Sequence, residues 1–170
     1  MKGLKFETQI DGAIASLIFH GDISMESELP KLEMNGIQVL KVDMGDVQYI
    51  NSSGVRKWMM WNWSFTKNFP KLKLILSRVP SVIVKQINSI KGFVPDGSVI
   101  TSVFVPYFCE QCDEVAESPV EFDAHLASAL AKNKFEKAIP ILKCPKCGMP
   151  MDVDIIGEQY ESLYKTYAPK

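Results

Sequence analysis

Four cysteines in two closely spaced pairs are the residues of this sequence best suited to chemistry. Cys109 and Cys112 form one Cys-x-x-Cys loop, and Cys144 and Cys147 form a second. Each loop lets two thiolates approach one ion at tetrahedral angles, and two loops complete a four-coordinate shell without an open position. We therefore predict a structural Zn²⁺ site with these four cysteines as its ligands.

Two other interpretations of the cysteines stay open, a thiol-disulfide oxidoreductase and spare buried thiols. An oxidoreductase would need only one such pair, usually where a helix begins below a parallel strand. Two disulfides are disfavoured, because they would need an oxidising compartment. The chain shows neither a signal peptide at its start nor an apolar run long enough for a membrane span. We therefore expect a cytoplasmic protein that does not associate with membranes.

The region around the cysteines resembles a zinc ribbon. Apolar or aromatic pairs precede both loops, namely Tyr107-Phe108 and Ile141-Leu142, and Pro145 and Gly148 occupy positions common in zinc knuckles. The gap between the loops is longer than the usual roughly 15–20 residues. We expect a helix near 119–133 to fill the additional length.

Composition argues for an ordinary globular protein. The chain has 170 residues, 46% hydrophobic and 23% charged, with a formal net charge of −1. This balance gives no attraction for polyanions, so nucleic acid is an unlikely partner. The length suits an α/β domain over residues 1–106 and a smaller zinc-ribbon-like module over 107–170. No flexible linker separates them, so we expect the two to be fused.

Alternating strand and helix patterns are expected to position these residues. An Asp11-Gly12 turn predicts a hairpin of two N-terminal strands, and a proline at the first helical position after Ser118 predicts the helix between the cysteine loops. The predicted strands are 4–10, 13–19, 37–44, 72–76, 99–108 and 139–142, and the predicted helices are 25–34, 51–65, 80–90, 119–133 and 160–167. This order predicts a mixed sheet with parallel pairs and with helices packed on it.

Residues 39–55, VLKVDMGDVQYINSSGV, resemble the signature of STAS domains, the anti-sigma-factor-antagonist fold. That signature is a buried strand, a short turn and an Asp-Ser-Ser/Thr-Gly motif that opens a helix. The order of strands and helices also matches, so the resemblance covers about residues 4–106. It implies a STAS-like α/β fold and a non-catalytic regulator that binds another protein, such as an anti-sigma-like kinase.

The resemblance makes Ser52 a candidate phosphorylation site, because a partner kinase phosphorylates the first serine of the motif in the family. Phosphate is tolerated at a helix N-terminus, and its charge can repel a docked partner. The sequence departs from the family's switch members at Asn51, where they carry Asp. The alternative is that Asn51, Ser52 and Ser53 only cap the helix.

Three tryptophans follow this motif in the same predicted helix. Trp58, Trp61 and Trp63 cannot all face one core stripe, so at least one is expected near the surface. Such a residue would serve a binding surface, or would pack against the zinc module. The predicted partner surface comprises Asn51, Ser52, Ser53, Gly54, Trp58 and Trp61.

We find no catalytic motif and predict that the chain is not an enzyme. Asp43 and Asp46 could act as paired carboxylates, but a solvated turn is the better interpretation. Two alternative functions stay open, a nucleic-acid-associated zinc protein and a thiol-disulfide oxidoreductase. A homodimer is compatible with the sequence, since a strand leading directly into Cys109 would allow protomers to exchange modules.

Overall fold

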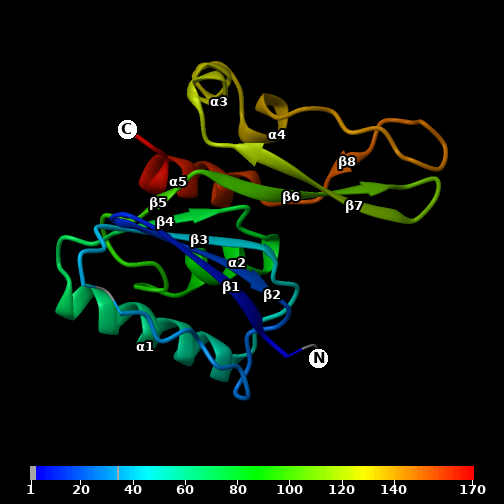
Figure 1. The fold of residues 1–170 in the computed structure, drawn as a ribbon. Coiled ribbons are helices and arrows are strands. Elements are labelled where there is room, and N and C mark those ends of the chain that lie inside the picture. The colour runs from blue at the N-terminus through cyan, green and yellow to red at the C-terminus, as the bar shows by residue number, and fades with distance from the viewer. Residues whose placement is uncertain (1–2, 34) are drawn as a thin grey trace.

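The computed structural model describes residues 3–33 and 35–170, which form two sheets with helices (Figure 1). The first sheet has the order β1-β2-β3-β4-β5 and the second has the order β7-β6-β8. The strands are β1 Lys5–Asp11, β2 Ile14–His20, β3 Val39–Asp46, β4 Lys73–Ser77, β5 Val99–Ile100, β6 Ser102–Cys109, β7 Glu114–Glu121 and β8 Asp152–Val153. The helices are α1 Ser52–Asn68, α2 Ser81–Ser89, α3 Ala124–Leu130, α4 Phe135–Ala138 and α5 Gly157–Tyr167. The predicted α/β class with a mixed sheet is confirmed.

The first sheet combines an antiparallel hairpin with parallel strands. β1 and β2 pair antiparallel across a tight turn at Gly12, whose φ of 55° favours glycine. The pairs β2–β3, β3–β4 and β4–β5 are parallel, as the alternation of strands and helices predicts. The carboxyl ends of parallel strands lie at the same end of the sheet, so the loops that follow β3 and β4 meet there.

One face of the first sheet forms the core beneath α1. Alternate residues of β2, β3 and β4 are buried, among them Phe19, Val42 and Leu76. Trp58 of α1 meets Phe19 edge to face, with ring centroids 6.2 Å apart. Figure 1 shows α1 lying across this side of the sheet. The opposite residues of these strands are mostly only partly buried.

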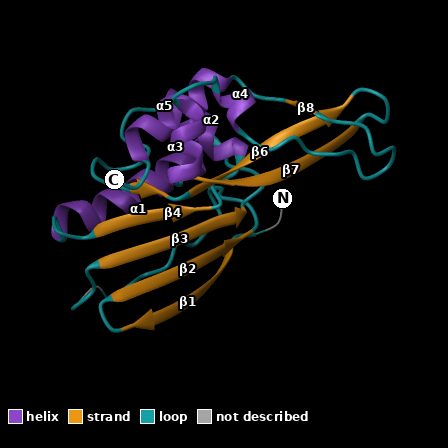
Figure 2. Cartoon of the chain, turned by 90° about the horizontal axis from the view of Figure 1, so that it is seen from above, coloured by secondary structure: helices purple, strands orange, loops and turns teal. Residues whose placement is uncertain are grey.

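The second sheet extends away from the first as an arm, which we define as β6, β7, β8 and the two cysteine loops. Figures 1 and 2 show both cysteine loops at the far end of this arm. At the near end, α5 packs against α2 and β5. The C-terminal elements therefore cover the β5 edge of the first sheet, whereas β1 forms the opposite edge (Figure 2).

The predicted division after residue 106 falls within β6. Val103, Val105 and Tyr107 are buried on both sides of that position and belong to one hydrophobic cluster with the core of the first sheet. The strand runs from Ser102 to Cys109, so no flexible tether separates the arm from the first sheet. The division into two domains stays a prediction.

The helix predicted over 25–34 is wrong for residues 25–33, and residue 34 lies outside the described residues. The segment is an irregular loop held against α1 by side chains that bind its carbonyl groups. Trp61 Nε1 donates to the Pro30 carbonyl at 2.8 Å, and Lys57 Nζ donates to the Ser27 carbonyl at 2.9 Å. Pro30 also lacks the N–H group that a helix interior needs.

The helix predicted over 119–133 begins later than expected. Residues 118–121 belong to β7, where Ser118 pairs with Val105 and Glu121 pairs with Ser102 of β6. β7 is an edge strand, which tolerates Pro119. The helical part is α3, capped by Asp123, whose Oδ1 accepts from the Leu126 N–H group at 2.8 Å.

Two predicted strands also differ from the structure. The strand predicted over 99–108 divides at Thr101, whose N–H group donates to Leu76 of the first sheet and whose carbonyl accepts from Phe122. The strand predicted over 139–142 is an extended loop. The closing helix predicted near 160–167 is confirmed as α5.

None of the helices in the described part of the chain combines the length and the hydrophobicity that a membrane crossing requires.

Candidate functional site

The four cysteines converge at the far end of the arm. Their sulfur atoms all lie within 4.8 Å of one another, and Cys109 Sγ and Cys147 Sγ are 3.7 Å apart. Four thiolates at about 2.3 Å from a tetrahedral ion have sulfurs about 3.8 Å apart. No disulfide joins the cysteines. The four residues therefore lie close enough to hold one metal ion.

Backbone hydrogen bonds shape each cysteine loop. The Cys112 N–H group donates to the Cys109 carbonyl at 3.3 Å, which closes the first loop. In the second loop the Cys144 N–H group donates to Met149, and the Cys144 carbonyl accepts from Gly148 at 2.9 Å. Gly148 has a φ of 73°, which other residues rarely adopt. Glycine therefore suits the turn that brings Cys144 and Cys147 together.

Backbone N–H groups of the second loop lower the pKa of the Cys144 thiol. The N–H groups of Cys147 and Lys146 lower the pKa of the Cys144 thiol to about 7. A hydrogen bond with the Cys147 sulfur, together with burial, raises the pKa of Cys112 to about 12. Burial also raises the pKa of Cys109. Thiols this crowded resist ionising together unless a cation lies among them, so the arrangement suits a bound metal ion.

An ion pair outside the sulfur cluster joins the two loops. Lys146 of the second loop pairs with Glu114, the first residue of β7 after the first loop. The carboxylate of Glu114 raises the pKa of Lys146. This contact ties the Cys144–Cys147 loop to the β6–β7 hairpin even though few hydrogen bonds connect β8 to β6.

The predicted motif at residues 51–54 begins α1. Asn51 is the N-cap, and its Oδ1 accepts from the Gly54 N–H group at 2.8 Å, so the capping expected of Asn51 is confirmed. Ser52 is the first helical residue and is exposed. A hollow of about 360 Å³ adjoins it, lined by Tyr49, Val55, Gln86 of α2 and Ile90 at the end of α2. Phosphorylation of Ser52 stays a prediction.

Two residues of the predicted partner surface are buried, so they cannot contact a partner. Gly54 packs directly against the backbone of Ile23. Trp58 is fully buried between Phe19 and Phe93, and its Nε1 donates to the Phe93 carbonyl at 2.9 Å. The prediction is wrong for both residues, because Gly54 packs on the loop after β2 and Trp58 packs on the sheet.

The other tryptophans of α1 lie toward the surface. Trp61 is half-buried and donates to the loop before β3, as described above. Trp63 is 62% exposed, and Lys67 Nζ lies 4.9 Å from its ring centroid. The expectation of a tryptophan near the surface is therefore confirmed at Trp63. The alternative that the zinc module buries the surface tryptophan is wrong for Trp63, which stays exposed.

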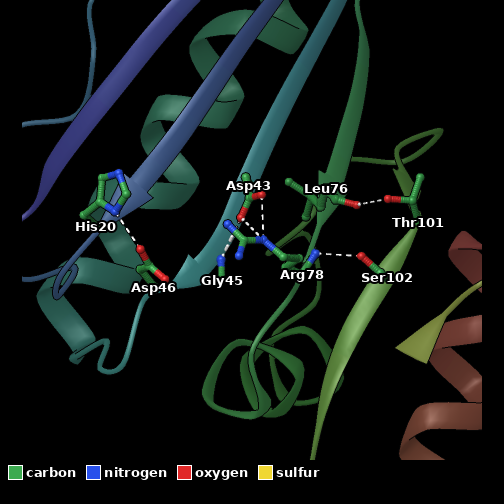
Figure 3. A network of polar contacts seen from close by, with 8 residues as sticks. All are labelled: His20, Asp43, Gly45, Asp46, Leu76, Arg78, Thr101 and Ser102. Carbon is green, nitrogen blue, oxygen red and sulfur yellow. Dashed lines mark hydrogen bonds and ion pairs between the residues drawn. The ribbon is translucent and has the colours of Figure 1, made fainter. Parts of the chain in front are cut away.

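A polar network joins β3 to the loop after β4 (Figure 3). Arg78 Nε donates to both carboxylate oxygens of Asp43, at 2.9 and 2.8 Å. The Arg78 N–H group donates to the buried Ser102 hydroxyl at the start of β6, also at 2.9 Å. The Asp43 carboxylate raises the pKa of Arg78. The network therefore connects the first sheet to the arm, at the end of the sheet where the parallel strands have their carboxyl ends.

Asp46 forms a separate contact beside this network. Its carboxylate lies 2.7 Å from Nδ1 of His20 at the end of β2, as Figure 3 shows. On the other side of the ring, His20 Nε2 lies 3.5 Å from Glu7 of β1. Asp43 and Asp46 thus have different partners. Asp46 is exposed, as a solvated position requires, whereas Asp43 is partly buried in its ion pair with Arg78.

Arg78 provides a test of this junction, because its backbone φ of 48° is unfavourable for any residue except glycine. Arg78→Ala and Arg78→Gly both remove the ion pair, but only glycine relieves the backbone. We expect Arg78→Gly to be more stable than Arg78→Ala by about 1 kcal/mol, measured by urea unfolding.

The matched control is the same pair of substitutions at Ser64, an exposed position within α1. There alanine should be more stable than glycine by about 1 kcal/mol, the usual helical order. An Arg78→Ala variant as stable as Arg78→Gly would show that the left-handed backbone does not limit stability at this position.

Sequence reasoning missed His20 and Arg78 as partners of the two aspartates. Arg78 and Asp43 lie 35 residues apart in the chain, so no local spacing connects them. One signal was available. Asp43 lies near the end of one predicted parallel strand and Arg78 follows another, and the carboxyl ends of parallel strands lie at the same end of the sheet.

No protein-family model matches this chain, and no curated protein matches it either.

Proposed function

We propose that the chain is a non-catalytic regulatory protein-interaction module, resembling the anti-sigma-factor antagonists, with a structural Zn²⁺ that fixes the end of the arm. The observation that carries the proposal is the start of α1. Ser52 is exposed at the first helical position, next to exposed Tyr49 and a hollow between α1 and α2. A partner docked there would contact the residue at which a phosphate would add charge.

The sheet supports the STAS-like interpretation of this surface. An antiparallel hairpin at the edge, followed by parallel strands alternating with α1 and α2, is the order that the resemblance implies. Asn51 performs the capping role of the motif's first residue. With Gly54 and Trp58 buried, the proposed surface consists of Asn51, Ser52, Ser53 and the half-buried Trp61, and adds Tyr49, Gln86 and Ile90 beside Ser52.

The donor atoms support zinc as the metal. Four thiolates are the ligands that structural Zn²⁺ sites favour, and four of them leave no position for substrate. A redox centre would use one pair, whereas here both pairs converge. Unpaired thiols also fit the reducing cytoplasm, which is where we place the protein.

The test compares proteins retained from native cytosol by the zinc-loaded wild-type chain and by Ser52→Glu, identified by mass spectrometry. We expect at least one protein to be held by wild type and lost with Ser52→Glu. The matched control is Ser64→Glu, which adds the same charge at an exposed position further along the same helix and should retain that protein.

Retention of the same protein by wild type, Ser52→Glu and Ser64→Glu alike would rule out a charge switch at Ser52. Retention of nucleic acid alone, released by salt, would instead favour the nucleic-acid-associated alternative and overturn the proposal.

A further inference from the structure

β1 is an edge strand that only β2 pairs with in the described part of the chain. All seven of its residues, Lys5–Asp11, are exposed. Figure 2 shows β1 outermost in the first sheet. At the opposite edge, β5 contacts α5. An open edge of this length presents unpaired N–H and C=O groups to any strand that can align with it.

The open strand also carries apolar side chains that are exposed. Phe6 is 40% exposed and Ile10 is 57% exposed. They lie directly opposite the buried residues Phe19 and Ala15 of β2, so they share the face that α1 covers further inside the sheet. Phe6 also lines a hollow of about 730 Å³ beside α1. Pairing with another strand would cover this apolar margin.

The sequence of β1 is complementary to itself when two copies run antiparallel about Thr8. In this register Lys5 faces Asp11 of the other copy, and Phe6 faces Ile10. Glu7 faces Gln9, and Thr8 faces its own counterpart. Each dimer then has two pairs of opposite charges, two apolar pairs and no like-charge pair.

Neighbouring registers that keep the same faces together are less favourable. Centring the pairing on Glu7 places two glutamates opposite each other, and centring it on Gln9 places Glu7 opposite Asp11. Like charges directly opposite in a sheet are destabilising. Charged residues on an edge strand usually oppose pairing, but here the register about Thr8 turns them into attractive pairs.

We propose that β1 is a self-association site, at which a second copy of this chain pairs antiparallel about Thr8 and joins two five-stranded sheets into one continuous sheet. The contact is isologous, because each copy offers the same strand, so it closes at two copies. It lies at the opposite edge of the sheet from the arm (Figure 2), and so it does not require exchange of the zinc-bearing module.

Charge reversal at the two ends of β1 tests the register by analytical ultracentrifugation of the full zinc-loaded chain. Wild type should form dimers. Lys5→Asp and Asp11→Lys each place like charges opposite each other twice per dimer, and each should raise the dimer Kd about tenfold. An equal mixture of the two variants should form heterodimers about as tightly as wild type, because every charge pair becomes attractive again.

The mixture also separates association from folding, since only folded chains with complementary β1 strands can recover. Lys132→Asp, at an exposed position after α3, is the control for a charge change remote from β1 and should dimerise like wild type. A monomeric wild-type chain would overturn the proposal. So would single variants that dimerise as tightly as wild type, or a mixture that stays as weak as its components.

A cysteine at the centre of the register gives a second measurement. Thr8→Cys places two thiols directly opposite each other, within reach of a disulfide, so mild oxidation should cross-link the zinc-loaded dimer. Gln9→Cys faces Glu7 instead and should cross-link much less. Equal cross-linking of the two variants would contradict pairing about Thr8.

Discussion

Replacing Cys144 with serine should abolish stoichiometric Zn²⁺ binding and release the end of the arm. Serine keeps the size of the side chain but lacks the thiolate that the N–H groups of Cys147 and Lys146 stabilise in the second loop. We expect the metal content, measured by mass spectrometry of the purified chain, to fall from about one ion per chain to near zero.

The stability cost should be large for a single substitution. The sulfur cluster and the Lys146–Glu114 ion pair join the two loops directly. The segments that flank the second loop are held to β6 by the short pairing with β8 and by hydrogen bonds from Asp154 to Pro106 and from Tyr107 to Pro140. Structural zinc contributes roughly 10–16 kcal/mol of apparent binding free energy in small peptides. We expect the Cys144→Ser variant to lose at least about 3 kcal/mol of this in the folded chain.

Limited proteolysis should locate the damage. Cleavage is expected first within residues 109–114 and 143–150, while α1 and the first sheet stay protected. Chelation of the wild-type chain should reproduce this pattern, and added Zn²⁺ should reverse it. The control is Lys146→Ala, which keeps the backbone N–H group that supports Cys144 and should keep a full complement of metal. Unchanged metal content in Cys144→Ser would rule out the four-cysteine site.

The cluster of four cysteines could be predicted from the sequence because its information is local. Each Cys-x-x-Cys loop specifies its own turn, and the expectation of one shared ion predicted that the two loops would meet despite their distance in the chain. The parallel strands could also be predicted from the sequence, because buried strands in such sheets appear as short apolar runs separated by helices. These predictions did not depend on which distant segment each strand would contact.

The errors arose where a distant partner overrides a local signal. Ser118, Pro119 and Glu121 have the spacing of a helix start, yet they belong to the edge strand β7, which pairs with β6 along its full length. Residues 25–33 have apolar side chains at helical intervals, but side chains of α1 bind their carbonyl groups. In both segments, tertiary hydrogen bonds outweigh the intrinsic helix preference, which is roughly a few tenths of a kcal/mol per residue.

At Gly54, too, a distant segment determines the role of a residue, and substituting this glycine is expected to have a large effect on stability. The sequence suggested a glycine within a partner-binding motif, whereas the structure places it where α1 meets the loop after β2. A Cβ atom at this position would lie 2.0 Å from the Ile23 carbonyl oxygen and 2.6 Å from its carbonyl carbon. Both contacts are with backbone, so no side-chain rotation relieves them.

The backbone around Ile23 is fixed from both sides. Its N–H group donates to the Tyr49 carbonyl at 2.9 Å, and its own carbonyl accepts from Asn51 at 3.3 Å. Moving Ile23 away from a new methyl group would break these bonds and shift the start of α1. The same contacts hold the loop that carries Ser52, so the close approach at Gly54 fixes the position of the proposed docking surface.

We therefore expect Gly54→Ala to destabilise the chain by about 3 kcal/mol or more, measured by urea unfolding. The sign distinguishes this from helix propensity, since alanine in place of glycine within a helix normally stabilises by about 0.5–1 kcal/mol. Gly3→Ala is the matched control, because a Cβ there meets nothing within 4 Å, and it should be nearly neutral. A Gly54→Ala variant as stable as wild type would mean that α1 can move away from Ile23, and the surface at Ser52 would then not be rigidly placed.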